Sequence, residues 1–592
     1  MKKFLIGLVA GFVLAGLAGV IAVFAVARMT DRQPSIPPSA ALIFRLEGEV
    51  PELAPLEIPL PLLESQSPVT VLDTWDLLRK AGSDARIKAV LFQPRGVGAG
   101  WAKLDQIRSS LVQFKRSGKP LYAFLHNPGA KEYYLATAAD KIFLTREDLL
   151  DLKGLRAEAT FYRRTLDKIG VQMEVEYAGK YKNAADAFLR TSMTPESREV
   201  LNSVLDQIYG HLVETVAQSR KRTPEQVRAL IDDGPFLAEQ AKAKGLVDGL
   251  LYEDEVMKDL KERLKGQELA TLSHRDYLKI PALSLGLEGR ERVAIVIGEG
   301  AITRGGGGGN SFGGDEGIRS GPFIKMLRQV ADDATIRGVI LRVNSPGGDA
   351  IASDDILHEV RRLSKRKPVV ISMSDLAASG GYFISMSGDP VLAYPNTFTG
   401  SIGVIYGKVN LAGLYEKLGL NVEILTRGRH ADIDSASRPL SEDGRKKLRE
   451  GVDFVYRSFL ERVAEGRRRK VEEVEPLAQG RLWLGLQAKG NGLVDELGGL
   501  DRAIEMIRKR AGIKDDEKIR LVRYPAKKTL FELLFSESSE SSLEAMVESA
   551  GRSALRLKLR ALSAQLGLAP EQAPFFPMQG ILRIAPYTVK VF

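Results

Sequence analysis

The sequence predicts an α/β protein made of two copies of one domain, each built around a mainly parallel sheet. Two observations support this fold class. The segment DARIKAVLFQP, which starts at Asp84, returns as DATIRGVILRV from Asp333, so the chain contains a repeat. Within each copy, short runs of β-branched residues alternate with segments that have the apolar spacing of helices.

The repeat extends through further blocks that keep the same order and nearly the same offset. YYLATAADKIFL from Tyr133 matches YFISMSGDPVLA from Tyr382, and VEYAGKYKNAADA from Val175 matches ILTRGRHADIDSA from Ile424. GKPLYAF and RKPVVIS form another matching pair. Several blocks in one order indicate an internal duplication. We therefore expect a first domain over 41–280 and a second over 281–515, followed by a C-terminal extension over 516–592.

The second copy shows the expected order of strands and helices. RVAIVIG, GVILRVN, PVVISM and PVLAYP read as strands, and SDDILHEVRRLSKR lies between the second and third of them. That segment has apolar residues at helical spacing. They are Ile356, Leu357, Val360 and Leu363. A strand, a helix and a strand in succession predict right-handed crossovers and a parallel sheet.

The N-terminus predicts a transmembrane anchor over 1–28. Lys2 and Lys3 precede an uncharged apolar run over 4–27, long enough as a helix to cross a hydrocarbon core of roughly 30 Å. The apolar region of a cleavable signal peptide is usually shorter, although AVFAVA offers an alternative cleavage site. Positive charge before the helix places the rest of the chain across the membrane. A linker rich in Pro and Ser follows over 29–40.

Composition excludes several classes of site. The chain has no cysteine, which rules out disulfides, thiol nucleophiles and Cys-ligated zinc. Its five histidines form no HExxH or similar ligand spacing, so we expect no metal and no cofactor. The net charge of +10 is spread among interspersed acids, and we expect no nucleic-acid partner.

The two copies differ in a reciprocal way at chemically important positions. The second copy carries NSPGGDA, SDLAASGGYFIS and TFTGSIGV, whereas the first has RGVGAGW and HNPGAKEYYLA at the places equivalent to the first two. Ser379 aligns with Ala130 of the first copy, and Lys182 aligns with Ala431 of the second. Each half therefore holds one candidate catalytic group and lacks the other.

This pattern predicts a Ser379 nucleophile with a lysine as its general base. A serine hydroxyl needs a base before it attacks a carbonyl, and a neutral lysine amine serves in known variants of the triad. Lys180 and Lys182 are both candidates. Lys182 is preferred because apolar residues follow it and because the second copy replaces it with alanine. We expect the pair to form within one chain, since the fusion holds the halves at high effective concentration.

Glycines beside the serine predict donors for an oxyanion. The N–H of Gly380 follows the nucleophile, and Gly347 and Gly348 follow the neighbouring strand, where they allow close backbone approach. Ser401, in TGSIG, is placed to orient the lysine. Each motif alone is typical of a turn or a solvated surface. The glycine run at 305–309 reads as a flexible loop, because no Gly-Lys-Ser/Thr follows it.

Together the motifs RVNSPGGD, AASGGYFIS and TGSIGV resemble the signature of signal peptide peptidase A (protease IV), serine protease family S49, with a Clp protease/crotonase-like fold. The resemblance implies Ser379 as nucleophile, Lys182 as base and Ser401 as its assistant. It also implies remnant signal peptides as substrates and a homotetrameric ring. The expected location is the cytoplasmic membrane, with periplasmic catalytic domains. Nothing is carried over to the glycine run or to the C-terminal extension.

Two other classes of function fit parts of the sequence. A crotonase-like acyl-CoA enzyme would share the fold and the oxyanion glycines, but would leave Ser379 idle and would turn over thioesters. An inactive membrane scaffold would explain the anchor and the repeat. It would give no reason for a serine in one copy and a lysine in the other.

Overall fold

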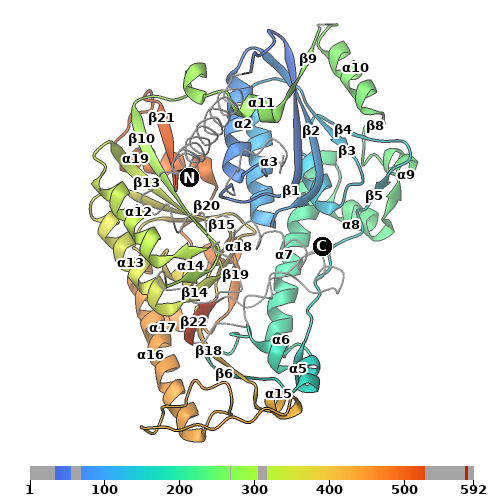
Figure 1. The fold of residues 1–592 in the computed structure, drawn as a ribbon. Coiled ribbons are helices and arrows are strands. Elements are labelled where there is room, and N and C mark those ends of the chain that lie inside the picture. Colours follow the sequence, from blue (N-terminus) through green and yellow to red (C-terminus); the bar gives the residue numbers. More distant parts are fainter. Residues whose placement is uncertain (1–33, 55–67, 267, 305–316, 527–579, 585–592) are drawn as a thin grey trace, which may run out of the picture.

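The structure is a computed structural model, and Figure 1 shows the fold. The described residues are 34–54, 68–266, 268–304, 317–526 and, as backbone, 580–584. In this part of the chain no helix is both long and apolar enough to cross a membrane. The predicted anchor at 1–28 lies outside the described residues, as do the glycine run at 305–309 and most of the C-terminal extension.

The first copy is built on a six-stranded sheet in which every pair is parallel. Its order is β8 (Gly249–Leu250), β4 (Lys141–Leu144), β3 (Leu121–Leu125), β2 (Ile87–Gly98), β1 (Ala40–Glu49) and β9 (Ala270–Ser273). The central strands are almost wholly buried, as expected for a parallel sheet that is covered on both faces. Helices α2 (Val71–Ser83), α3 (Trp101–Lys115) and α4 (Ala130–Ala136) follow in the same copy.

The second copy has a matching sheet with one antiparallel edge, where β17 meets β19. Its main path is β19 (Leu482–Leu484), β17 (Phe398–Gly400), β15 (Val369–Ala378), β13 (Ile336–Ser345), β10 (Glu291–Glu299) and β21 (Ile519–Tyr524). Strands β16 (Val391–Ala393) and β20 (Glu496–Leu497) join beside β15. β21 falls inside the predicted C-terminal extension, yet it pairs with β10 as β9 pairs with β1.

Helix α13 (Ala350–Ser364) covers the predicted segment between β13 and β15. Asp349 caps it by accepting hydrogen bonds from the N–H groups of Ile351 and Ala352. The four apolar residues with helical spacing are all buried, at no more than 1% exposure. The α/β class, the mainly parallel sheets and the duplication predicted from sequence are confirmed.

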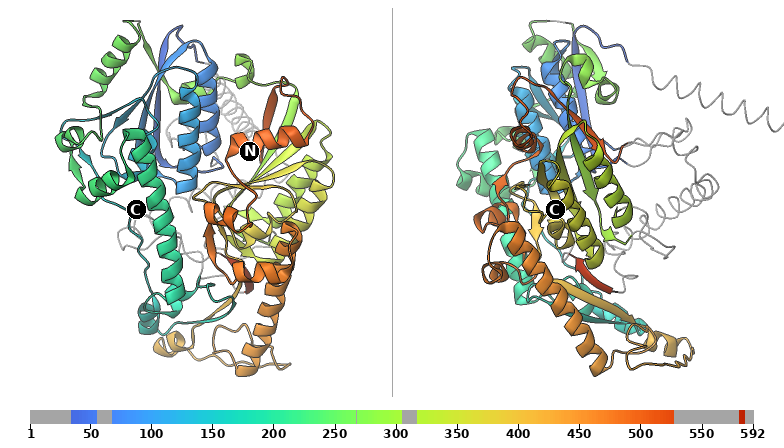
Figure 2. Two further views of the ribbon diagram at one scale, coloured as in Figure 1. Left: turned by 180° about the vertical axis from the view of Figure 1, so that it is seen from behind. Right: turned by 90° about the vertical axis from the view of Figure 1, so that its left-hand side faces the viewer.

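The duplication is repeated in the long helices. α7 (Pro195–Arg220) and α16 (Glu442–Arg467) each contain 26 residues and run towards the same end of the molecule (Figures 1 and 2). Each begins at a hydroxyl N-cap, Thr194 or Ser441, and ends at a residue with left-handed backbone. Each also carries a terminal arginine whose Nη1 lies 2.9 Å from an aspartate oxygen. The two pairs are Arg220–Asp248 and Arg467–Asp495.

A third sheet joins the copies. β6 (Gln172–Ala178) of the first copy pairs antiparallel with β18 (Val404–Asn410) of the second along all seven residues of each strand. The same sheet contains β12 (Ile318–Arg319), β11 (Ile302–Thr303), β14 (Gly347–Asp349) and β22 (Gly580–Ile584). This sheet brings the lysine-bearing segment of the first copy to the serine-bearing half.

A buried ion pair also crosses between the copies. The Arg342 guanidinium donates from Nε and Nη2 to the Glu52 carboxylate at 3.1 and 2.9 Å, and both side chains are 3% exposed. Burial alone would raise the pKa of Glu52, but Arg342 and Lys103 hold that pKa below its usual value. The carboxylate therefore stays charged in the interior, where it depends on these cations.

Candidate active site

Ser379 occupies the turn between β15 and the short helix α14 (Gly380–Phe383). Its backbone has φ 52° and ψ −116°, a conformation that costs a residue with a side chain energy and persists only where neighbours enforce it. Its N–H donates to the Gly400 carbonyl at 2.8 Å, and its own carbonyl accepts from the Phe383 N–H at 2.8 Å. The side chain is fully buried. The turn therefore fixes the direction of the hydroxyl.

Lys182 follows β6 and reaches the serine of the other copy. Its Nζ lies 2.9 Å from the Ser379 Oγ, 3.0 Å from the Ser401 carbonyl oxygen and 3.1 Å from the Ser401 Oγ. The lysine is 2% exposed, and both serines are fully buried. A neutral amine has two N–H donors and one lone pair. The N–H groups suit the two Ser401 oxygens, and the lone pair suits the Ser379 O–H.

Lys180, the alternative lysine of the sequence argument, lies elsewhere. Its side chain is exposed, and its Nζ sits 4.8 Å from the centre of the Tyr181 ring. Lys182, Ser379 and Ser401 are thus brought together within a single chain, whereas Lys180 is not part of the group.

A short segment of the second copy, Gln479–Arg481, holds both the lysine and Ser401 in place. The Gln479 carbonyl accepts from the Tyr181 N–H at 2.8 Å, and the Arg481 carbonyl accepts from the Ser401 N–H at 2.7 Å. Gly480 packs so closely that a Cβ there would lie 2.6 Å from the Lys182 nitrogen. We call Gln479–Arg481 the brace. No motif in the sequence marked it.

The side chain of Arg481 attaches the brace to the first copy. Its guanidinium carbon lies 5.0 Å from the centre of the Tyr181 ring and 4.5 Å from that of Trp483. Its Nη1 donates to the Tyr181 hydroxyl at 3.2 Å and to the Glu199 carboxylate. The segment that supports the base is therefore itself held by residues from both copies.

The predicted oxyanion glycines lie beside one another. A Cβ on Gly380 would be 2.9 Å from the Gly347 Cα and 3.1 Å from the Gly348 nitrogen, so only glycine lets these segments approach. The N–H of Gly347 donates to the Ser345 Oγ at 3.1 Å, which means that this N–H already has a partner. The N–H groups of Gly380 and Gly348 are the better candidates for the oxyanion.

The tyrosines of the repeat support the reciprocal alignment. Tyr133 donates its hydroxyl to the Leu246 carbonyl at 2.7 Å, and Tyr382 donates in the same way to Leu493 at 2.8 Å. Ala130 and Ser379 each stand three residues before these tyrosines. The first copy therefore has the same local scaffold with alanine where the second has the serine.

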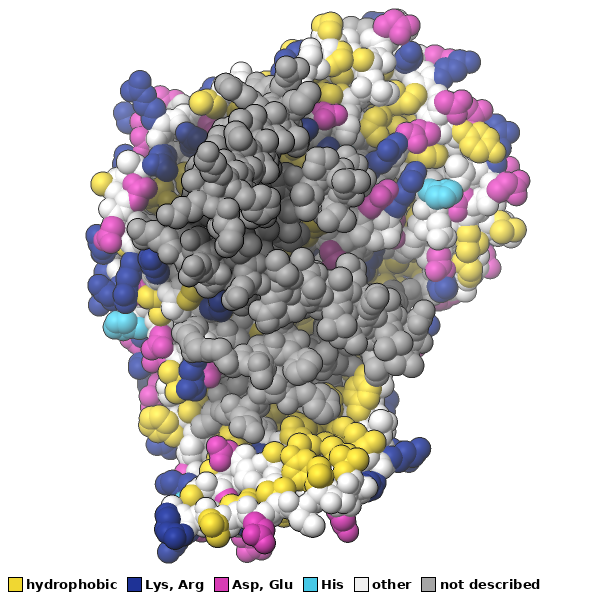
Figure 3. Space-filling model, in the orientation of Figure 1, with side chains coloured by type: hydrophobic (Ala, Val, Ile, Leu, Met, Phe, Trp, Pro, Cys, Tyr) yellow, Lys and Arg dark blue, Asp and Glu magenta, His cyan; other side chains and the backbone are white. Residues whose placement is uncertain are grey.

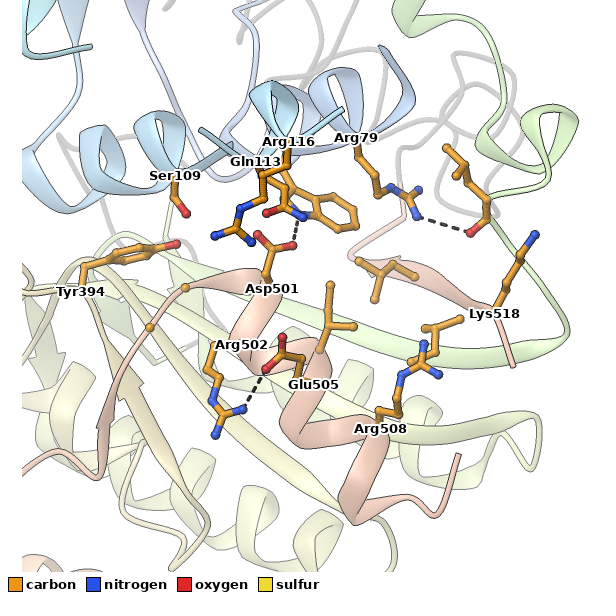
Figure 4. Close-up of a pocket in the computed structure, with 17 residues that line it drawn as sticks. Arg79, Ser109, Gln113, Arg116, Tyr394, Asp501, Arg502, Glu505, Arg508 and Lys518 are labelled. Atoms are coloured by element: carbon orange, nitrogen blue, oxygen red, sulfur yellow. Dashed lines mark hydrogen bonds and ion pairs between the residues drawn. The ribbon is translucent and has the colours of Figure 1, made fainter. Parts of the chain in front are cut away.

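A separate hollow lies between α2, α3 and α19 (Leu500–Arg510), and none of the predicted site residues lines it (Figure 4). Asp501 accepts from the Trp75 indole N–H at 2.7 Å, and burial raises its pKa. Arg502 donates to Glu505 at 2.8 Å. The charges shown there are already engaged between the copies, so this hollow is a poorer candidate site than the Lys182–Ser379 pair.

Comparison with known proteins agrees with this site. The model of peptidase family S49 matches twice, at residues 113–268 and 361–514. "Serine protease SPPA, chloroplastic" of Arabidopsis thaliana is 36% identical over 75% of this chain and 66% of its own length. "Protease 4" of Salmonella typhi is 31% identical over 81% of this chain and 78% of its own length.

Two further matches cover less of the chain. "Putative signal peptide peptidase SppA" of Enterococcus faecium is 38% identical over 33% of this chain and 56% of its own length. A mutant ClpP1 of Listeria monocytogenes gives a TM-score of 0.21 at 14% identity, over 36% of this chain and 95% of that one, which is too weak to define the fold. On the family match and its long relatives, the chain belongs to peptidase family S49 and is a serine peptidase.

Proposed function

We propose that Ser379 is the nucleophile of this peptidase and Lys182 its general base. The observation that carries the proposal is the 2.9 Å separation of Lys182 Nζ and Ser379 Oγ in a buried setting. The neutral amine takes the hydroxyl proton as Oγ attacks the peptide carbonyl. The resulting ammonium gives that proton to the leaving amine, and water later hydrolyses the acyl-enzyme through the same base.

The oxyanion of each tetrahedral intermediate needs backbone donors. We assign this role to Gly380 and Gly348, and the loss of one such donor typically costs about 2.7–4 kcal/mol. Ser401 is assigned the orientation of the lysine, since two of its oxygens lie within 3.1 Å of Nζ. A thioester-processing enzyme of crotonase type has no need for this serine–lysine contact.

The experiment is a set of three alanine variants. Ser379→Ala and Lys182→Ala should each lower kcat by at least about a thousandfold, while thermal unfolding confirms that both remain folded. Lys180→Ala is the matched control, because that lysine is exposed and two residues away. A fluorophosphonate probe should label Ser379 in the wild type. Activity should rise with pH as the base loses its proton, and near-wild-type turnover by either dyad variant would refute the assignment.

We further propose that the peptidase is anchored by residues 1–28 and degrades remnant signal peptides and similar apolar peptides at the membrane. The long apolar run after Lys2 and Lys3 supports the anchor. The periplasmic location and the Clp protease/crotonase-like assignment of the two domains belong to the same proposal. N-terminal sequencing of the membrane-bound protein tests the anchor, and a mature chain that begins after Ala27 would contradict it.

An oligomeric ring is supported by an exposed apolar surface. Figure 3 shows hydrophobic side chains gathered at the lower end of the molecule, where β6 and α15 (Ala412–Lys417) lie. Exposed apolar residues of this region are Leu418, Leu420, Val422 and Leu425. Surfaces of this kind mark contacts with other copies or with apolar partners. We propose a tetramer, and light scattering that showed a monomer at assay concentration would contradict it.

A further inference from the structure

The C-terminal strand β22 lies between two strands of the second copy. It pairs antiparallel with β14, where Ile584 stands opposite Gly347, and antiparallel with β18, where Gly580 stands opposite Gly407. Leu582 is the central residue and pairs on both sides, with Asp349 and with Ile405. Figure 1 shows the dark red strand between its two neighbours. In the described sheet, β22 is what connects β14 to β18.

The two flanking strands are the ones that carry the candidate site. The backbone of β14 at Gly347 and Gly348 lies against Gly380, the residue after the nucleophile. β18 begins three residues after Ser401, and its other edge pairs with β6, from which the chain leads to Lys182. A peptide whose carbonyl reaches Ser379 must therefore lie along these strands.

The space between β14 and β18 has the width of one strand. Neighbouring strands lie about 4.8 Å apart, so two edges that share a single partner leave room for one extended chain. Strand edges bind an extended peptide through main-chain hydrogen bonds, largely independently of its sequence. A substrate peptide and β22 therefore compete for the same edges.

We propose that β22 occupies the peptide-binding groove and acts as a built-in competitive inhibitor of this peptidase. This inference rests on the proposed function. In register, Ile584 is the β22 residue opposite Gly347, and so it lies at the end of the strand nearest the nucleophile. Because the strand belongs to the same chain, its effective concentration is of the order of millimolar. If it binds as weakly as about 100 μM, it still fills roughly nine grooves in ten.

The test compares two substitutions at the central residue of β22. Leu582→Pro removes one N–H and fixes φ, which breaks the strand pairing, whereas Leu582→Val keeps a residue that favours strands. Leu582→Pro should raise kcat/KM for a short apolar peptide, and the rate of fluorophosphonate labelling at Ser379, by about tenfold. Leu582→Val should stay within about twofold of the wild type.

Two truncations and one peptide complete the design. A chain that stops after Gln579 lacks β22 and should match Leu582→Pro, whereas a chain that stops after Ile584 keeps the strand and should match the wild type. A synthetic peptide with the sequence of residues 580–592 should return the activated variants towards the wild-type rate. The free peptide has no tether, so this requires concentrations near its dissociation constant.

The outcomes separate this inference from the proposed function. If Leu582→Pro and the Gln579 truncation are labelled at Ser379 no faster than the wild type, β22 is not an inhibitor, and the dyad assignment stands. If no variant is labelled or hydrolyses peptide, both proposals are wrong. If mass spectrometry finds the tail cut near Ile584 in the wild type but not in Ser379→Ala, the strand is a substrate and the proposal of a standing inhibitor is overturned.

Discussion

Gly480→Ala tests whether the brace sets the position of the catalytic base. Gly480 has φ +74°, and a Cβ at this position would lie 2.6 Å from the Lys182 nitrogen and 2.7 Å from its Cα. Ordinary van der Waals contact begins at 3.4 Å, so the two backbones must separate by about 0.8 Å. A shift of that size is enough to lengthen the 2.9 Å contact between Lys182 and Ser379 beyond hydrogen-bonding distance.

The expected effects follow from this displacement. A misplacement near 1 Å costs up to about a hundredfold in rate, so kcat should fall by roughly 10–100-fold. The left-handed backbone adds about 1–2 kcal/mol for a residue with a side chain, and the free energy of unfolding should fall by about 1–3 kcal/mol. The assays are steady-state hydrolysis of a peptide substrate and urea unfolding of the same preparations.

Gly388→Ala is the matched control. Gly388 has φ +91°, so it shares the backbone penalty, but no atom lies within 4 Å of the place that a Cβ would take there. It should lose similar stability and keep its kcat. Wild-type kcat in folded Gly480→Ala would refute the role of the brace. An equal loss of kcat in Gly388→Ala would show that general destabilisation is the cause.

Two further predictions concern stability. Arg342→Met strands the buried Glu52 carboxylate and should lower the free energy of unfolding by about 3–5 kcal/mol in urea, whereas Arg337→Met, an exposed change on the same strand, should cost no more than about 1 kcal/mol; equal losses would contradict the buried pair. Burial lowers the pKa of His274 to about 4, so its neutral form favours the folded state, and this contribution is complete above pH 6.5 and lost as pH falls towards 4. It amounts to about 3 kcal/mol. His274→Gln should flatten that pH dependence of unfolding and the exposed His358→Gln should not, and an unchanged slope in His274→Gln would contradict the assignment.

Local pattern was enough to predict what lies within one copy. The β-branched runs became the buried strands, and helical spacing placed the four apolar residues of α13 in the core. The reciprocal Ser379/Ala130 and Lys182/Ala431 pattern singled out the groups that the structure brings together. Such features are encoded by neighbours in the sequence, and the duplication gave each of them an internal reference.

Contacts between the copies could not be predicted in the same way. Glu52 and Arg342 are an ordinary charged pair until docking buries them together. The brace carries no motif, since it acts through backbone carbonyls and any sequence supplies carbonyls. Strand β22 lies in an extension with no counterpart in the repeat, so nothing indicated its partners. Docking depends on the shape of assembled surfaces, which a linear pattern does not record.

The candidate site therefore exists only where the copies meet, and its geometry depends on that contact. Ser379 and Ser401 both hold positive φ, at 52° and 50°, so each needs neighbours that enforce it. Ser401 is held by the brace, which the first copy holds in turn through Tyr181 and Glu199. A change that loosens the docking of the copies should consequently misplace the base before either domain unfolds, and kcat should fall at lower urea concentrations than the signal of global unfolding.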